Sequence, residues 1–296
     1  MASEHRIIVF GDVIDDIVVV PRVSVRPDTD TTASIRHRAG GSAANTAVWL
    51  GTLGAQVDFV GRVGASDIQR HAQHFFAAGV DALLSLDPTE PTGTIVIIVD
   101  GDERTMLTER GANANLDITA ISDTMLDNAV AMHFTGYSII DCRDPSALRT
   151  LIDRARARGV IVSVDPGSAG YIADFGVKKF LKAIGGVDVV FPNLDEGRLL
   201  TGESEPALVA DALAQLFPVV AVTLGPDGVY IAQPGVRAQQ VPSLVTRIVD
   251  PTGAGDAFAA GFLRSYTRDR HLATAAKAGV RTASRALTLI GGRPPV

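Results

Sequence analysis

The sequence predicts an α/β protein with a doubly wound β-sheet covered by helices on both faces, an α/β/α sandwich. Short continuous apolar runs, typical of strands buried on both faces, alternate with stretches of helical periodicity along the 296 residues. Parallel strands joined by crossover helices produce this alternation. The strand candidates are residues 6–11, 57–63, 129–135, 160–164, 187–191 and 219–224. The helix candidates are residues 42–53, 68–78, 145–158, 177–184 and 206–217.

Glycines support three of the helix boundaries. Gly54, Gly79 and Gly159 each stand just after a helical run. A helix commonly ends on a residue with left-handed φ, and glycine adopts that conformation without a steric penalty. We therefore expect these three helices to end at their glycines.

Two segments, residues 17–38 and 92–108, interrupt the alternation of strands and helices. Within the second, two apolar runs flank Asp100-Gly101, a dipeptide typical of tight hairpin turns. Both segments are expected to form extra β-structure. Because open α/β sheets bind ligands beyond their strand ends, this structure is a candidate lid, and a plain extension of the sheet edge is the alternative. We expect one domain, residues 1–296, with two inserted lid segments.

Composition and charge exclude several classes of protein. The hydrophobic content of 46% is sufficient for a large core. A formal net charge of -6 argues against general binding to nucleic acids or to membrane surfaces, which requires a basic field. Cys142 is the only cysteine, so neither an intrachain disulfide nor a thiolate zinc cluster can form. The sequence also lacks a Walker P-loop, a complete G-x-G-x-x-G, a G-x-S-x-G and an H-E-x-x-H motif.

The two ends of the chain give further expectations. The first ten residues lack the apolar region and cleavage site of a signal peptide, and no segment reaches ~18 uninterrupted apolar residues. We therefore expect a cytoplasmic protein. Pro294-Pro295 predicts a frayed C-terminal tail.

The most informative stretch is the glycine-rich turn at residues 250–262, which opens a helix of small residues. Gly253 and Gly255 allow positive φ and close approach of a ligand, so the N–H groups of the first helical turn can converge on an anion. Asp256 in that turn is favoured at any helix N-terminus. A carboxylate beside an anion hole can also take a proton from a hydroxyl that attacks a bound phosphoryl group.

The stretch at residues 250–262 resembles the C-terminal signature of the ribokinase-like (PfkB) carbohydrate kinases, and residues 39–47 resemble their N-terminal signature. Three further matches lie between or before them, at residues 11–16, 193–196 and 223–228. Each match is short, but five in the family's order cover nearly the whole chain. The resemblance implies a Rossmann-like core with a small β-sheet lid, and an ATP-dependent kinase that phosphorylates a hydroxymethyl group of a small carbohydrate.

Carried over residue by residue, the resemblance makes Asp256 the catalytic base, with Gly253, Ala254 and Gly255 as the anion hole for the transferred phosphoryl group. A non-catalytic sugar- or nucleotide-binding regulator on the same fold is the competing class. The intact glycine-rich element argues against it, because a binder has no need of a base beside the anion hole.

The acceptor end of the predicted site lies in the N-terminal motifs. Asp16 matches the family carboxylate that accepts hydrogen bonds from sugar hydroxyls, and Asp12 is a second candidate. A polar turn between strand and lid is the alternative role for both. Gly40 and Gly41 are expected to let the sugar approach the backbone, and Asn45 to bind a hydroxyl or to hold the lid loop.

The nucleotide end is expected to lie in two other motifs. Asn193 and Glu196 match the family's N-x-x-E element, which helps to arrange Mg²⁺ through water; a helix-capping box is the structural alternative. Thr223, Gly225 and Gly228 are expected to line the nucleotide, or the two glycines serve only a hairpin turn.

Asp250 and Thr252 correspond to residues that surround a monovalent cation in many relatives. The implied cofactors are therefore ATP and Mg²⁺, with K⁺ as a candidate.

The substrate and the assembly are less determined. Fructose-like ketohexoses, pentoses and sugar acids of the 2-keto-3-deoxygluconate type are candidate acceptors, and Arg110 is the lid-side cation that could meet a sugar carboxylate. A nucleoside kinase of adenosine type is the main alternative. The apolar faces of the lid predict a homodimer joined through the lids, with Ile95 or Ile97 on the outward face; a monomer whose lid folds onto its own core is the alternative.

Overall fold

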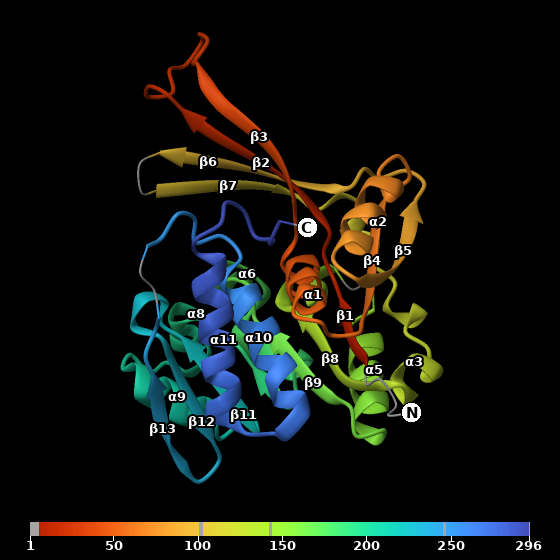
Figure 1. Cartoon of the computed structure of the whole chain (residues 1–296), viewed down its shortest axis with the longest axis vertical. Coiled ribbons are helices and arrows are strands. Elements are labelled where there is room, and N and C mark those ends of the chain that lie inside the picture. Colours follow the sequence, from red (N-terminus) through yellow and green to blue (C-terminus); the bar gives the residue numbers. More distant parts are fainter. Residues whose placement is uncertain (1–5, 101–102, 142–143, 245–246, 296) are drawn as a thin grey trace.

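The central β-sheet consists of parallel strands with an antiparallel hairpin at one edge (Figure 1). The computed structural model describes residues 6–100, 103–141, 144–244 and 247–295, and within them this sheet has nine strands in the order β13-β12-β11-β10-β9-β8-β1-β4-β5. The strands are β1 (Arg6–Phe10), β4 (Val57–Gly64), β5 (Val80–Asp87), β8 (Ala129–Thr135), β9 (Ile161–Asp165), β10 (Val189–Val190), β11 (Val219–Thr223), β12 (Val229–Gln233) and β13 (Val236–Val241).

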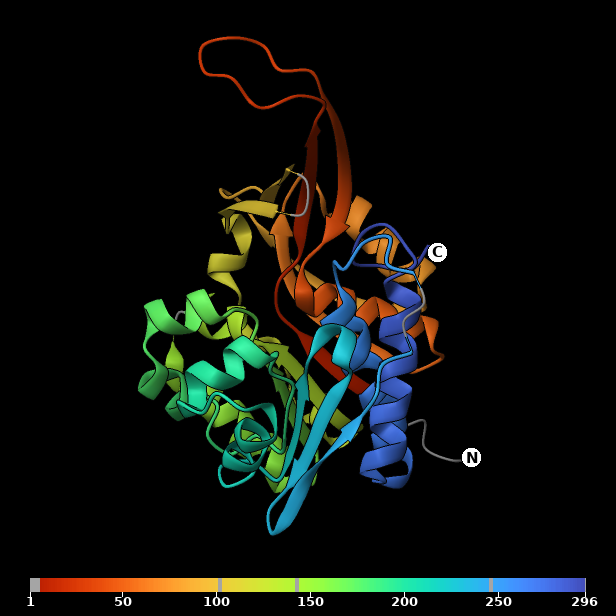
Figure 2. The same ribbon diagram turned by 90° about the vertical axis from the view of Figure 1, so that its left-hand side faces the viewer.

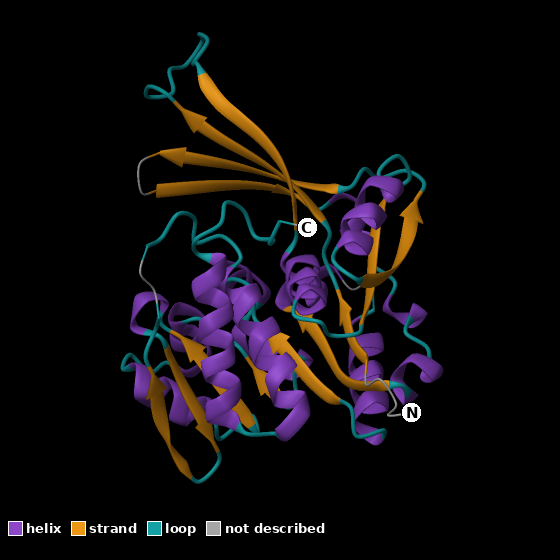
Figure 3. Ribbon diagram, in the orientation of Figure 1, coloured by secondary structure: helices purple, strands orange, loops and turns teal. Residues whose placement is uncertain are grey.

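Helices cover both faces of this sheet, which confirms the predicted class (Figure 3). Alternate residues of β1 enter different cores: Ile7 and Val9 pack with α1, α10 and α11, whereas Ile8 and Phe10 pack with α5 and α9. The helices are α1 (Ser42–Thr52), α2 (Ile68–Ala77), α3 (Asp123–Asp127), α4 (Gly136–Asp141), α5 (Pro145–Ala157), α6 (Ala169–Phe175), α7 (Val177–Ala183), α8 (Leu194–Thr201), α9 (Pro206–Leu213), α10 (Ala254–Asp269) and α11 (Leu272–Ala286).

The winding direction of the sheet reverses next to β1. The chain runs outward from β1 through β4 to β5, and then crosses to the other side of β1 to form β8, β9, β10 and β11. The loops that follow β1 and β8 therefore lead in opposite directions. Open α/β sheets bind ligands in the crevice at such a switch point, beyond the carboxyl ends of the strands.

The predicted extra β-structure forms a second, smaller sheet that projects from the carboxyl-end side of the central sheet (Figures 1 and 2). Its order is β3-β2-β6-β7, with β2 (Ile14–Pro21) antiparallel to β3 (Ala33–Gly40) and parallel to β6 (Gly93–Asp100), and with β7 (Glu103–Glu109) pairing with β6. The β2–β3 strands begin and end a few residues outside the expected segment. Gly101 of the expected turn lies outside the described residues.

The register of the small sheet determines which side chains share a face. Ile95 pairs with Asp16 and with Thr108, and Ile97 pairs with Met106, so these residues lie on the face toward the core. Neither Ile95 nor Ile97 is outward, contrary to the expectation. The opposite face carries Ile17, Val19, Ile35, Val96, Ile98 and Leu107.

Predicted and observed elements differ most at the sheet edges. Strand β5, which was not predicted, alternates buried and exposed positions at one edge, and β13 at the other edge is mostly exposed. Neither has the continuous apolar run of a central strand. The expected strand at 187–191 is shorter, Val189–Val190, although the flanking Asp188 N donates to the Val162 carbonyl at 2.7 Å and Phe191 N donates to the Val164 carbonyl at 3.0 Å. Gly54, Gly79 and Gly159 have φ of 75°, 74° and 73°, as expected of helix ends.

The expectation of a frayed C-terminal tail is wrong. The tail lies beside α1 beneath the small sheet, where the Trp49 indole N–H donates to the Gly292 carbonyl at 2.9 Å (Figure 1). Gly291 N donates to Asp250 Oδ2 at 2.9 Å, and Pro294 is buried. Trp49 of α1 and Asp250, in the loop before α10, therefore hold the tail against the core. The two consecutive prolines in the sequence do not reveal these contacts.

The two remaining features of the fold concern the cysteine and membrane-spanning helices. Cys142 lies outside the described residues. Among the helices that are described, none combines the length and the apolar character needed to cross a membrane.

Candidate functional site

A cleft of about 720 Å³ lies at the carboxyl ends of the parallel strands, facing the inner side of the small sheet. Its walls include Asp12 after β1, Tyr137 after β8, Asp165 at the end of β9, Asn193 after β10 and Thr223 at the end of β11. These positions are far apart in the sequence. The parallel sheet brings them together because all these strands end at the same edge.

The first turn of α10 forms one wall of the cleft. Gly253 precedes the helix with φ of 74°, and no side chain caps this helix start. A Cβ on Gly253 would lie 2.5 Å from the Gly292 Cα, so the close approach of the tail also requires glycine. Gly253, Ala254 and Gly255 all line the cleft, where an uncapped helix N-terminus can bind an anion.

Asp256 is held at this helix start by two hydrogen bonds from α1. Ser42 Oγ donates to Asp256 Oδ1 at 2.6 Å, and Asn45 Nδ2 donates to Asp256 Oδ2 at 2.8 Å. Burial raises the pKa of Asp256 to about 7, although both hydrogen bonds favour the charged form. The carboxylate is therefore oriented and is poised to exchange a proton near neutral pH.

Asn45 was expected to bind an acceptor hydroxyl or to hold the lid loop. It lines the cleft, and its amide also contacts Asp256 and Arg293 of the tail. Ser42 was expected only to begin a helix. Its hydroxyl group is one helical turn from Asn45, on the same side of α1, and this spacing is the sequence signal that could have identified it.

Asp12 binds the start of α1. Its two carboxylate oxygens accept hydrogen bonds from Ser42 N at 2.9 Å and Ala43 N at 3.1 Å, and Oδ1 also accepts from Thr135 Oγ1 at 3.2 Å. Gly41 has φ of 94°, and a Cβ there would lie 2.5 Å from the Asp12 carbonyl oxygen. Asp12 and Gly41 thus line the cleft and also shape the strand-to-helix turn.

Asp16 lies on β2 at the root of the small sheet, lines the cleft and is only 8% exposed. Burial raises its pKa to about 7, and the neighbouring carboxylates act in the same direction. A Cβ on Gly40 would overlap the Asp16 carboxylate. Gly40 therefore makes room for the Asp16 side chain. The sequence analysis had assigned it a different role, the close approach of a sugar to its backbone.

Arg293 is a partly buried cation beside these groups, and no motif in the sequence pointed to it. Its Nε donates to Asn45 Oδ1 at 2.9 Å, and its Nη2 donates to the Gly40 carbonyl. Burial lowers its pKa to about 10, while Asp16, Asp12 and Asp256 oppose that shift. Nothing in a terminal Gly-Gly-Arg-Pro-Pro marks this position, because the contact depends on how the tail folds back.

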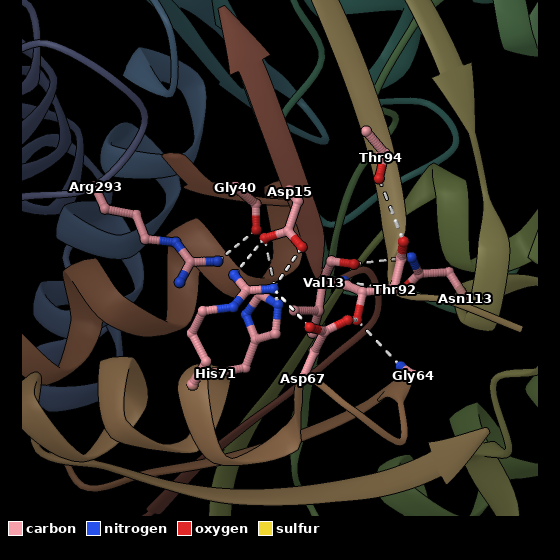
Figure 4. A network of polar contacts seen from close by, with 11 residues as sticks. Val13, Asp15, Gly40, Gly64, Asp67, His71, Thr92, Thr94, Asn113 and Arg293 are labelled. Carbon is pink, nitrogen blue, oxygen red and sulfur yellow. Dashed lines mark hydrogen bonds and ion pairs between the residues drawn. The ribbon is translucent and has the colours of Figure 1, made fainter. Parts of the chain in front are cut away.

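A polar network anchors the small sheet to α2 on the other side of Asp16 (Figure 4). Arg70 forms a two-pronged ion pair with Asp15 at 2.6 and 2.7 Å and also contacts Asp67 at 3.1 Å. Thr92 Oγ1 donates to Asp67 Oδ2 at 2.7 Å and accepts from Gly64 N at 3.1 Å. Asp15 thus has a structural role: its ion pair with Arg70 fixes this part of β2 and thereby positions the neighbouring Asp16.

The opposite end of the cleft contains the Asn193–Glu196 pair. Asn193 Oδ1 accepts from Glu196 N at 2.9 Å, and Glu196 Oε2 accepts from Asn193 N at 2.9 Å, which is the capping box foreseen as the structural alternative. Asn193 Nδ2 also donates to Glu196 Oε1 at 2.7 Å. Both residues line the cleft, so the capping box holds a carboxylate at its edge.

Asp165 is a second carboxylate at this end and was not predicted. Burial, with Glu196 and Asp256 nearby, raises its pKa well above the ordinary value. Buried carboxylates that repel one another fit a hydrated divalent cation. Among the described residues, no group of three or more His, Cys, Asp or Glu side chains is arranged to hold a metal ion.

The remaining predicted residues also reach the cleft or its rim. Thr223, Gly225, Gly228 and Thr252 line it. Gly228 has φ of 91°, and a Cβ there would overlap the carbonyl of Val241 on β13, so this glycine also serves the turn before β12. Asp250 accepts hydrogen bonds from Thr252 N and Gly291 N, both at 2.9 Å, and thereby joins the loop before α10 to the tail.

The small-sheet side of the cleft is largely apolar. Ile95, Ile97 and Met106 face the cleft there. Opposite them, Tyr137 and Tyr171 meet edge to face with ring centroids 5.2 Å apart. The Arg110 guanidinium lies 5.4 Å from the centre of the Tyr137 ring and lines the same region, as expected of a lid-side cation. This end can therefore contact an apolar or planar group as well as an anion.

Comparisons with known proteins agree with this geometry. The family described as pfkB family carbohydrate kinase matches residues 4–296. An ATP-dependent ribose-1-phosphate kinase of Halopiger xanaduensis is 32% identical over 291 residues, covering 95% of this chain and 92% of that protein. The crystal structure of adenosine kinase from Sinorhizobium meliloti has a TM-score of 0.88 at 27% identity, covering 100% of this chain and 97% of that one. A proposed ribokinase II of Escherichia coli, solved with ATP and Mg²⁺, shares the fold with a TM-score of 0.84 at 19% identity, covering 97% and 94%.

The raised pKa of Asp16 gives a prediction about stability. An Asp that titrates near 3.8 when unfolded and near 7 when folded stabilises the protein at low pH, and this contribution is lost as the pH rises between those values. Asp16→Asn should therefore become progressively more stable than the wild type over that interval, with a constant difference above it. Urea unfolding across this pH range measures the difference. The exposed Asp195→Asn is the control, and a pH-independent difference for Asp16→Asn would contradict the assignment.

Proposed function

The chain belongs to the pfkB family of carbohydrate kinases, and we propose that it transfers the γ-phosphoryl group of ATP to a hydroxymethyl group of a small carbohydrate. One observation carries the proposal: the oriented carboxylate of Asp256 stands in the same helical turn as the uncapped N-terminus formed by Gly253, Ala254 and Gly255. Candidate acceptors are a ketohexose such as fructose, a pentose, or a sugar acid of the 2-keto-3-deoxygluconate type.

Asp256 acts as the general base in this proposal. Ser42 and Asn45 each bind one of its oxygens, so a lone pair is directed into the cleft without a change of rotamer. The carboxylate orients the attacking hydroxyl group and accepts its proton as the bond to phosphorus forms. A base with a pKa of about 7 is half ionised near neutral pH and is stronger than an ordinary Asp.

The helix N-terminus supplies the electrostatic stabilisation. In this proposal the transferred phosphoryl group lies at the N–H groups of residues 253–255 and the positive end of the α10 dipole; no side chain caps this helix start, and Ala254 N donates to the Pro251 carbonyl at 3.3 Å. These groups are fixed by the fold, so they need no reorganisation as negative charge develops.

Asp16 is the proposed acceptor-binding carboxylate, because its side chain reaches the cleft from the root of the small sheet. Asp12 contributes mainly by holding the start of α1, since both of its oxygens already accept N–H groups. Arg110 is positioned for the carboxylate of a sugar acid.

The nucleotide is proposed to occupy the other half of the cleft, along Thr223, Gly225 and Gly228, with Asn193 and Glu196 near its phosphates. Glu196 and Asp165 would hold Mg²⁺ through water, and the ion, when bound, would offset phosphate charge. A K⁺ ion beside Asp250 and Thr252 remains part of the proposal.

A specific observation favours a nucleoside as the second candidate acceptor. The apolar face formed by Ile95, Ile97 and Met106, together with Tyr137 and Tyr171, could cover a planar base while Asp16 binds the ribose hydroxyls. The aromatic residues of this face were not recognisable in a chain with 5% aromatic content. A free sugar would leave much of the face without contacts.

The decisive experiment measures ATP consumption with a panel of ketohexoses, pentoses, sugar acids and nucleosides. Turnover with one class and none with the others identifies the acceptor. If no acceptor accelerates ATP consumption while ATP still binds, the non-catalytic regulator becomes the better account.

Replacing the base gives the sharpest mutational prediction. Asp256→Asn keeps the size of the side chain but removes the proton acceptor, so kcat should fall by ~10²–10⁴-fold. ATP and acceptor affinities should stay within several-fold, as measured by calorimetry. Asp195→Asn, on the exposed side of α8, is the control, and an Asp256→Asn enzyme with more than half of the wild-type rate would remove Asp256 from the mechanism.

The acceptor site predicts a selective change in KM. Asp16→Ala removes a charged acceptor of hydrogen bonds, a loss of about 1.5–3 kcal/mol, so the acceptor KM should rise roughly ten- to hundredfold. The KM for ATP should change little, because ATP binds at the other end. Initial-rate kinetics with each substrate varied in turn measure the two values, and equal weakening of both would indicate a folding effect.

We also propose a homodimer joined through the small sheets. The outward face of the small sheet exposes Ile35 (58%) and Leu107 (57%) next to Ile17, Val96 and Ile98. A two-fold contact between two such faces would bury these side chains and hold each small sheet in place over its own cleft, which faces the opposite side of the sheet.

The dimer is tested by charge on that face. Leu107→Glu or Ile35→Glu should produce monomers with a raised acceptor KM, as measured by light scattering and kinetics. The control is Thr124→Glu, at an exposed position on α3 away from the small sheet, which should leave the assembly unchanged. A wild-type protein that is monomeric at tens of micromolar and fully active would reject the dimer.

A further inference from the structure

We propose that Arg293, in the C-terminal tail, is a positioning residue for the proposed phosphoryl transfer. It fixes the Asn45 side chain in the orientation that donates to Asp256, and it holds the Gly40 backbone beside the acceptor-binding Asp16. The inference rests on the proposed function, because it assigns Arg293 a role through the base and through the acceptor carboxylate.

The first support is the continuous chain of contacts. Arg293 Nε donates to Asn45 Oδ1 at 2.9 Å, and Asn45 Nδ2 donates to Asp256 Oδ2 at 2.8 Å. The second guanidinium prong, Nη2, donates to the Gly40 carbonyl, as drawn in Figure 4. One planar group thus connects the base with the backbone against which Asp16 packs.

The second support is the chemistry of the Asn45 amide. An arginine side chain has only donors, so it can bind only the carbonyl end of that amide. The NH₂ end must then face Asp256, where it donates to the ionised carboxylate. Without Arg293 the amide could rotate by half a turn and present its oxygen to Asp256, which would favour the protonated base.

The third support is the charge environment. Asp256 faces Asp12 from the turn after β1, Asp16 from β2 and Asp165 from β9, all of them carboxylates. Arg293 acts in the opposite direction on both Asp16 and Asp256. Its own pKa of about 10 keeps it charged at neutral pH, so it makes ionisation of the base easier at physiological pH.

The tail is fixed independently of Arg293. Trp49 Nε1 binds the Gly292 carbonyl, and Asp250 Oδ2 accepts from Gly291 N. A Cβ on Gly292 would overlap the Asn45 amide, and a Cβ on Gly253 would overlap Gly292. Gly253 and Gly292 therefore allow the tail to pass between α1 and the start of α10. Replacement of the Arg293 side chain therefore leaves these anchors in place.

The test compares the pH dependence of kcat in three variants, with the acceptor identified by the panel. In the profile of kcat against pH, the fall in rate on the acid side is called the acid limb. Arg293→Met should shift the acid limb to a pH about one unit higher, as expected for loss of an opposite charge, and should lower kcat at neutral pH. Arg293→Lys should restore the acid limb toward the wild type, because it keeps the charge, but not the full kcat, because it cannot bind both oxygens in the same way.

Arg285→Met is the matched control. Arg285 lies over the Trp49 ring at 5.7 Å, near the tail but away from Asn45, so its loss should leave the acid limb unmoved. An Arg293→Met enzyme with an unmoved acid limb would overturn the proposal. Arg293→Met should also lower kcat by a smaller factor in an Asn45→Ala background than in the wild type. Full additivity of the two effects on the activation free energy would contradict positioning through Asn45.

A measurement without turnover separates this inference from the proposed function. The loss of unfolding free energy caused by Arg293→Met should grow as the pH rises through about 7, because Asp16 and Asp256 then ionise beside an absent cation. A loss independent of pH would reduce Arg293 to a packing role. If the wild type phosphorylates no acceptor, the proposed function fails, while this measurement still decides the role of Arg293.

Discussion

The contact between the first turn of α10 and the first turn of α1 is the interaction on which the site depends. Asp256 is buried there, so its carboxylate requires partners, and Ser42 and Asn45 provide them from the other helix. The same contact places the open helix start at Gly253 next to the end of the parallel strands. Both helices pack on one face of the central sheet, and this layer therefore fixes Asp256, the proposed base, and the proposed anion-binding backbone relative to each other.

Burial of so many carboxylates around one cleft sets the electrostatic character of the site. Asp16, Asp165, Glu196 and Asp256 all have raised pKa values, mainly because burial disfavours their charged forms. Positive charge at the cleft thus has two effects, since it stabilises ionised carboxylates and attracts phosphate groups. Arg293 supplies positive charge beside Asp16 and Asp256, and a hydrated metal ion near Glu196 and Asp165 is part of the proposed function.

The small sheet connects substrate binding with the mechanics of the fold. Asp16 and Asp15 are consecutive on β2, so one side chain faces the cleft and the other faces α2. The Arg70, Asp67 and Thr92 contacts then tie the root of the small sheet to the core (Figure 4). The rest of the sheet extends past the cleft, with apolar residues on both faces, which suits a surface that closes on a ligand or on a partner.

The sequence by itself determined the α/β class, the central strands, the helix ends at Gly54, Gly79 and Gly159, and the presence of a carboxylate, Asp256, in a glycine-rich helix start. These features depend on local periodicity, backbone freedom and short motifs. The tertiary structure alone decided the partners of Asp256, the cleft-facing side of the small sheet and the docking of the tail. Asn45 and Arg293 are 248 residues apart in the sequence, and Asp165 approaches Asp256 from a different strand end. These groups meet only when distant helices, strand ends and a returning tail pack together, and no local pattern encodes such a meeting.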